Sequence, residues 1–148
     1  MKKEILIIGS GGQGALTIGE IICRAINKKN YAVSFYPFYG SQMRGGSSSC
    51  VVKIDTENDF IINPTMNVAT DIIVLDEKYI DNYKDNMNEE TVIYKNEFLN
   101  DKDANIKMLK KYVENNDFID DENIVFCLRE KFINSSICDE KINIYRGI

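Results

Sequence analysis

The chain has 148 residues, of which 44% are hydrophobic and 28% charged, and its 18 basic and 23 acidic side chains give a formal charge of −5. This length and composition predict one domain, residues 1–148, with one compact core. The chain contains no histidine, which excludes Ser-His-Asp hydrolysis and histidine-based metal catalysis within it. The acidic balance argues against nucleic acid or an anionic membrane as a partner.

The first 28 residues predict a strand, a glycine turn and a helix. The apolar run from Glu4 to Ile8 ends at Gly9 and is typical of a strand buried on both faces of a parallel sheet. Apolar residues then recur at three- and four-residue steps, which predicts a helix over about 13–28.

Further strands and helices alternate along the chain. Strands are expected at 32–36, ending before Pro37, and at 47–54, 71–76 and 91–94. A short helix is expected through Tyr79 and Tyr83, and a short extended piece at 61–62. This alternation predicts an α/β, Rossmann-like fold with a mainly parallel sheet flanked by helices.

The pattern weakens beyond residue 95. Apolar residues mark two further helices, one through Ile106, Leu109 and Val113 and one through Ile124, Leu128 and Phe132. The tail at 134–148 shows no clear period, and no linker divides the chain into two domains.

Charge and cysteine content differ along the chain. Residues 1–75 carry a net charge of +1 and residues 76–148 a net charge of −6, so an anion site is expected in the first half. The four cysteines, Cys23, Cys50, Cys127 and Cys138, form no CxxC pair. We therefore predict packed, reduced thiols, with no metal site or iron–sulfur cluster. The chain shows neither a signal peptide nor an apolar run long enough to span a membrane, so a cytoplasmic location is expected.

The glycine-rich stretch at 9–14, Gly-Ser-Gly-Gly-Gln-Gly, follows a predicted strand and opens a predicted helix. There, glycines permit a tight turn and leave helix N–H groups aimed at an anion. The alternative is that these glycines only allow close packing of the strand against the helix. Two elaborations are missing. No acidic residue ends the second strand to hold a ribose, and Ala15 and Leu16 replace the Lys and Ser/Thr of a phosphate loop.

A second glycine-rich loop, 38–46, contains Arg44 followed by two glycines. A guanidinium can bind a carboxylate or a phosphate with two hydrogen bonds; the alternative is an ordinary surface arginine. If the first two strands are neighbours, the two glycine loops share a crevice at the carboxyl edge of the sheet. The candidate binding residues are Gly9, Gly11, Gly12, Gln13, Gly14, Tyr39, Gly40, Arg44, Gly45 and Gly46.

Taken together, the two loops carry a resemblance to a known family. The glycine loop at 9–14, Tyr36-Pro-Phe-Tyr-Gly40, Met43-Arg-Gly-Gly46 and the Ser/Cys-rich strand through Cys50 closely resemble the gamma subunit of 2-oxoacid:ferredoxin oxidoreductases over residues 3–95. The sequence looks most like the 2-oxoglutarate, or broader 2-oxoacid, type, and the related pyruvate and indolepyruvate enzymes share the domain.

This resemblance implies a subunit without catalytic residues of its own. Such complexes oxidatively decarboxylate a 2-oxoacid on thiamine diphosphate, pass electrons through iron–sulfur clusters to ferredoxin and form an acyl-coenzyme A. The cofactors would lie on alpha, beta and ferredoxin-like delta partners, with none bound by this chain alone. The gamma domain would pack beside the active site, where it could line the path of coenzyme A, with Arg44 on a coenzyme A phosphate or a partner carboxylate.

Two other hypotheses stay open at this point. One is a free-standing nucleotide-binding module with a regulatory or transferase function, supported by the strand–glycine loop–helix unit. The other is a purely structural assembly subunit whose glycine loop touches only protein.

Overall fold

The computed structural model describes residues 1–38 and 46–148. Five strands form a sheet within these ranges: β1 (Lys2–Ser10), β2 (Ala32–Pro37), β3 (Ser47–Asp55), β4 (Asp71–Val74) and β5 (Val92–Lys95). The predicted strands are therefore present, and Pro37 is the last residue of β2, opposite Cys50. No strand forms at 61–62; the described residues 56–70 connect β3 to β4 without a helix or strand.

The sheet is mixed, with the order β2-β3-β1-β4-β5. Its β1–β4 and β4–β5 pairs are parallel, whereas β1–β3 and β2–β3 are antiparallel. The predicted α/β class is confirmed, but a mainly parallel sheet is not. β3 follows β2 in the sequence and inserts between β2 and β1, so the first two strands are not neighbours.

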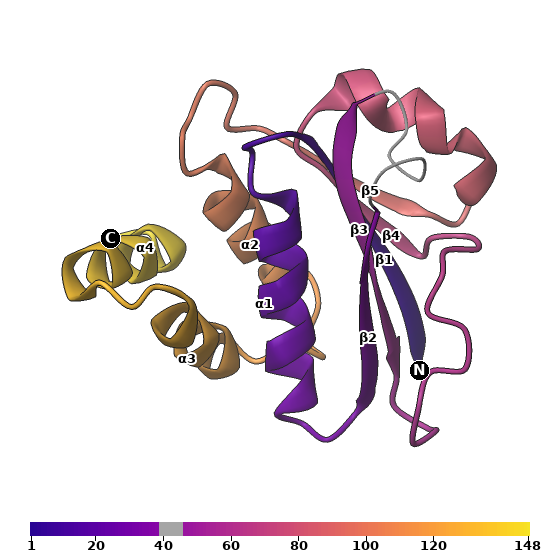
Figure 1. The fold of residues 1–148 in the computed structure, drawn as a ribbon, viewed down its shortest axis with the longest axis horizontal. Helices are drawn as coiled ribbons and strands as arrows, with labels where there is room; N and C mark the ends of the chain where they lie inside the picture. The colour runs from indigo at the N-terminus through magenta and orange to yellow at the C-terminus, as the bar shows by residue number, and fades with distance from the viewer. Residues whose placement is uncertain (39–45) are drawn as a thin grey trace.

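Helices cover both faces of the sheet (Figure 1). One face carries α1 (Ala15–Asn27), α2 (Ala104–Glu114), α3 (Asp121–Lys131) and α4 (Ser135–Arg146), and the other carries the 3-10 helix η2 (Glu77–Asn86). Ile5 and Ile7 of β1 belong to the core beneath α1, while Leu6 and Ile8 belong to the core beneath η2. Burial on both faces explains the continuous apolar run of this strand.

Helix α1 lies close against the sheet at Gly19. A Cβ added there would lie 2.5 Å from Sγ of Cys50 and 2.9 Å from Cε2 of Phe35. Glycine is thus required at this position by the approach of the helix to β3 and β2.

Helix α4 was not predicted, because its apolar positions follow no clear period. Its ends nevertheless carry ordinary capping signals. The side chain of Asn134 accepts hydrogen bonds from the N–H groups of Ser136 and Ile137, and Gly147 ends the helix in the left-handed region at φ 77°. None of the helices in residues 1–38 and 46–148 has the length and apolar character needed to cross a membrane.

Candidate functional site at the carboxyl edge of the sheet

A closed turn follows β1. The carbonyl of Ser10 accepts the N–H of Gln13 at 3.2 Å, and Oε1 of Gln13 accepts the N–H of Ser10 at 2.7 Å. Gly12 adopts φ +86°, which the third position of a type II turn requires. The side chain of Gln13 was predicted to contact a ligand. Its carbonyl oxygen instead accepts the hydrogen bond that closes the turn.

The four glycines of this loop divide into two pairs. Gly9 and Gly14 are packing positions: a Cβ on Gly9 would lie 3.1 Å from Oε1 of Gln13, and one on Gly14, at φ +82°, would collide with the side-chain amide of Asn105 on α2. Gly11 and Gly12 are exposed, and a Cβ on either would meet nothing within 4 Å. The hypothesis that these glycines only allow close packing therefore explains Gly9 and Gly14 but not Gly11 and Gly12.

The N-terminus of α1 begins at this turn. Gly14 is its N-cap residue, no side chain caps it by a hydrogen bond, and its first turn contains no acidic residue. The first N–H groups of a helix have no partner within the helix, and the helix dipole makes this end attractive to negative charge. The local geometry is therefore that of an anion-binding turn.

Two neighbouring parallel strands place this turn in a cleft. After β1 the chain passes to the face covered by α1, and after the parallel neighbour β4 it passes to the face covered by η2 (Figure 1). In open α/β sheets, ligands bind at the carboxyl ends of two adjacent strands that diverge in this way. The cleft has a volume of about 560 Å³. Its lining includes Gly12, Gln13, Leu75, Asp76, Asn96 and Asn105.

Asp76 is a lining residue that the sequence reasoning missed. An acidic residue was sought after the second strand, but the parallel neighbour of β1 is β4, and Asp76 follows the end of β4. Its carboxylate accepts the N–H of Lys78 at 3.2 Å, which caps η2. The available signal was the apolar run at 72–75, which is followed directly by this aspartate.

Most of the second predicted loop, namely Tyr39, Gly40, Arg44 and Gly45, lies outside the described residues. Gly46 is described; it is exposed and has φ +85°. The next residue, Ser47, pairs with Ser10, so Gly46 lies at the same sheet edge as the glycine turn. Gly46 thus reaches this edge through the antiparallel β3 rather than through adjacent first and second strands.

Buried hydroxyl groups attach η2 to the start of β3. Ser47, Ser49 and Tyr83 are each 0% exposed. The hydroxyl of Tyr83 lies 2.9 Å from Oγ of Ser47 and also hydrogen-bonds Oγ of Ser49. These bonds satisfy polar groups that burial would otherwise leave without partners, and they fix η2 beside the carboxyl edge.

The cysteines form no disulfide. Cys50, Cys127 and Cys138 are buried and Cys23 is half-buried. Burial raises the pKa of Cys23 to about 11 and also raises the pKa of Cys50 and of Cys127. These three thiols are therefore protonated at neutral pH, which makes them poor nucleophiles. Over the ranges that the structure describes, no group of three or more Cys, Asp or Glu side chains could hold a metal ion.

Comparison with known sequences identifies a family. The family model described as "Pyruvate ferredoxin/flavodoxin oxidoreductase" matches residues 4–131. The chain is 35% identical over 106 residues to 2-oxoglutarate synthase subunit KorC of Methanocaldococcus jannaschii, covering 67% of this chain and 52% of that protein. It is 32% identical over 84 residues to ketoisovalerate oxidoreductase subunit VorA of Methanothermobacter thermautotrophicus, covering 57% of this chain and 17% of VorA. The chain thus spans about half of KorC and a smaller part of VorA.

Comparison with solved structures supports the fold. Pyruvate oxidoreductase subunit PORC of Thermotoga maritima superposes with a TM-score of 0.78 at 16% identity, covering 99% of this chain and 94% of that one. The 2-oxoglutarate:ferredoxin oxidoreductase of Magnetococcus marinus, solved with 2-oxoglutarate, coenzyme A and succinyl-CoA bound, superposes with a TM-score of 0.78 at 15% identity, covering 99% of this chain and 30% of that one.

Proposed function

Because the chain belongs to the pyruvate ferredoxin/flavodoxin oxidoreductase family, we propose that its residues 1–148 form the gamma-type domain of a cytoplasmic, multi-subunit 2-oxoacid:ferredoxin oxidoreductase. In this proposal the complex oxidatively decarboxylates a 2-oxoacid, of the 2-oxoglutarate or pyruvate type, to an acyl-coenzyme A. Support comes from relatives whose names refer to 2-oxoglutarate and ketoisovalerate enzymes.

The proposal places the cofactors of the complex on other subunits. It has no histidine, and the described cysteines are separate, largely buried thiols. Thiamine diphosphate supplies the decarboxylation chemistry and iron–sulfur clusters supply the electron path. In the proposal both reside on alpha, beta and ferredoxin-like delta partners, with ferredoxin as the final acceptor. In this proposal the gamma chain binds and orients, and it contributes no histidine to proton transfer.

The observation that carries the proposal is the open pair Gly11 and Gly12 at an uncapped helix N-terminus. We assign the backbone N–H groups of Gly11, Gly12 and the first turn of α1 to an anionic group that enters the complex, namely a phosphate of coenzyme A or a partner carboxylate. Arg44 is proposed as its second ligand. A bound coenzyme A in the Magnetococcus marinus relative of like fold supports this choice.

Purification of the native protein tests the proposal. The expected result is a complex in which this chain accompanies one subunit that contains thiamine diphosphate and another that contains two four-cysteine iron–sulfur clusters. A stable, colourless and active monomer without those subunits would contradict it.

The open glycine turn also favours a second candidate, a free-standing nucleotide-binding module. Thermal-shift titration of the isolated chain with NAD, FAD, ATP and coenzyme A separates the two, because only such a module is stabilised saturably without partners. A purely structural subunit is the third hypothesis, and the packed pair Gly9 and Gly14 agrees with it. Within the assembled complex, Arg44→Ala should weaken the affinity for coenzyme A; weaker assembly at unchanged affinity would favour the structural role.

A further inference from the structure

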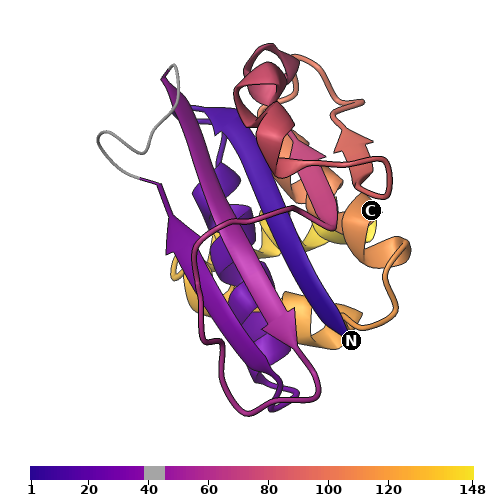
Figure 2. The same ribbon diagram turned by 90° about the vertical axis from the view of Figure 1, so that its right-hand side faces the viewer.

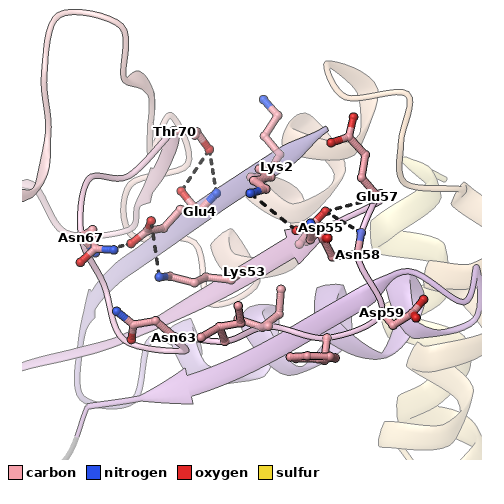
Figure 3. Close-up of a pocket in the computed structure, with 15 residues that line it drawn as sticks. Lys2, Glu4, Lys53, Asp55, Glu57, Asn58, Asp59, Asn63, Asn67 and Thr70 are labelled. Atoms are coloured by element: carbon pink, nitrogen blue, oxygen red, sulfur yellow. Dashed lines mark hydrogen bonds and ion pairs between the residues drawn. The ribbon is translucent and has the colours of Figure 1, made fainter.

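A second cleft lies at the opposite, amino edge of the sheet, beneath the connection from β3 to β4 (Figure 3). It has a volume of about 710 Å³ and lies between the ends of β1 and β3 and the loop at 56–70. Figure 2 shows this loop crossing the sheet face that α1 does not cover. The glycine turn lies at the other end of β1, so this cleft is separate from the candidate site.

The loop is held in place at several points. At its start, the carboxylate of Asp55 accepts the N–H groups of Glu57 and Asn58 at 2.9 and 3.1 Å. At its end, the N–H of Asn67 donates to the carboxylate of Glu4, and Ala69 is buried in the core beneath η2. Both ends of the loop are therefore attached to the sheet, which fixes the position of its middle section.

That middle section presents apolar side chains to solvent. Phe60 is 69% exposed and Ile62 is 87% exposed. From Phe60 to Thr70 the sequence contains no charged residue, although 28% of the whole chain is charged. Clustered exposed apolar side chains on a surface mark contacts with other proteins. A partner that covers this section must itself be uncharged there, because a charge buried without a counterion is costly.

The floor of the cleft offers hydrogen-bond donors that this chain does not use. Lys53 is 8% exposed, and among the described residues its ammonium group has one ionic partner, the carboxylate of Glu4 at 3.7 Å. An ammonium group has three donors, and buried donors normally have acceptors.

The charges around Lys53 select the kind of acceptor. Glu4, Asp55, Glu57 and Asp59 line the cleft with three lysines, so the local charge is slightly negative. The carboxylate of Glu4 already pairs with the ammonium group of Lys53, so the positive charge that would attract a free anion is neutralised. A peptide carbonyl is a neutral acceptor that can still bind the remaining donors of the ammonium group. An uncharged peptide segment therefore fits both the donors of the floor and the apolar loop.

We propose that this amino-edge cleft is the docking groove for an uncharged, apolar segment of the partner subunit that carries thiamine diphosphate. The segment packs against Phe60 and Ile62 and accepts a hydrogen bond from Lys53 through a backbone carbonyl. This inference rests on the proposed function, because it takes the partner from it.

The test is assembly of the full-length chain with its co-expressed oxidoreductase subunits. The double variant Phe60→Ser/Ile62→Ser should raise the dissociation constant of the complex at least tenfold. The thermal midpoint of the isolated chain should not change, because both side chains are exposed. Ile133→Ser is the matched control, since Ile133 is 94% exposed elsewhere on the surface, and its dissociation constant should stay within twofold of wild type.

Other results would overturn the inference in distinguishable ways. If wild type assembles and the double variant assembles equally well, the docking groove is wrong and the proposed function stands. If wild type binds no subunit that contains thiamine diphosphate, the proposed function fails and the inference fails with it. If the isolated chain is a dimer that the double variant converts to a monomer, the occupant is a second copy of this chain and not the partner subunit.

Discussion

The two edges of the sheet offer different kinds of contact. At the carboxyl edge, the glycine turn presents backbone, since Gly11 and Gly12 are open and no side chain caps α1. At the amino edge, the loop at 56–70 presents side chains, with Phe60 and Ile62 exposed above the buried Lys53. Bare N–H groups suit a small anion, whereas exposed apolar side chains suit a protein. In our proposals one edge therefore receives a ligand and the other a subunit.

The largest expected effect on stability separates packing glycines from open ones. Gly14→Ala should lower the free energy of unfolding by about 2 kcal/mol, because the left-handed region costs a side chain roughly 1–2 kcal/mol and the new Cβ would displace Asn105. Urea unfolding measures the change. Gly11→Ala is the control and should stay within about 0.5 kcal/mol of wild type. Equal losses of unfolding free energy in the two variants would contradict the distinction between packing and open glycines.

A charge placed in the open turn tests its proposed ligand. Gly11→Asp should raise the KM for coenzyme A in the assembled complex at least tenfold, which corresponds to about 1.4 kcal/mol, because a carboxylate would occupy the anion site. Stability should change little, since nothing lies within 4 Å of the new Cβ. Steady-state kinetics with coenzyme A as the varied substrate gives the result. An unchanged KM would assign the turn to protein contacts.

The stability that contacts among α2, α3 and α4 contribute should depend on pH. The hydroxyl of Tyr145 on α4 donates to Asp121 on α3 at 2.6 Å, and Lys110 on α2 contacts the same carboxylate at 3.1 Å. These contacts, first the Tyr145 hydrogen bond, lower the pKa of Asp121 below its ordinary 3.8. Their stabilisation is therefore present above pH 3.8 and lost as the pH falls through the lowered pKa.

Thermal unfolding of Asp121→Asn and wild type at several pH values measures this contribution. Wild type should be the more stable above pH 3.8, and the difference should shrink at lower pH. A difference that is constant from neutral pH into strong acid would show that the carboxylate contributes nothing through its charge.

The smallest expected effect concerns Ser34, which pairs with Lys53 in the strand register but does not line the amino-edge cleft. Ser34→Ala removes a buried hydroxyl without a partner among the described residues. The isolated chain should therefore be unchanged or slightly more stable, by up to about 1 kcal/mol. Because Ser34 does not line the amino-edge cleft, assembly of the variant should be unchanged. Destabilisation of the isolated chain by more than about 1 kcal/mol would mean that the hydroxyl already has a role within this chain.

The sequence predicted the local elements better than their arrangement. The apolar run before Gly9 and the helical spacing after it are local patterns, and β1 and α1 lie where they indicate. Strand order depends on contacts distant in sequence, and nothing local revealed that β3 inserts between β2 and β1. Helix α4 was missed because periodicity was weighed above its caps, Asn134 and Gly147.

Of the candidate site, the glycine loop was predicted from the sequence, but the residues placed by contacts distant in sequence were not. The glycine loop was found from its motif, but the roles within it were not, because the packing of Asn105 on Gly14 joins residues 91 positions apart in the sequence. Asp76 was missed because its place beside the turn follows from the β1–β4 pairing. The amino-edge cleft has no motif, since its lining comes from three separate segments.

Amide hydrogen exchange on the isolated chain and on the assembled complex tests the division between the two edges most directly. Assembly should slow exchange in the loop at 56–70, and addition of coenzyme A to the complex should then slow exchange at 11–17 without a further change at 56–70. Protection of 56–70 by coenzyme A, or no protection of 11–17 by it, would contradict the account.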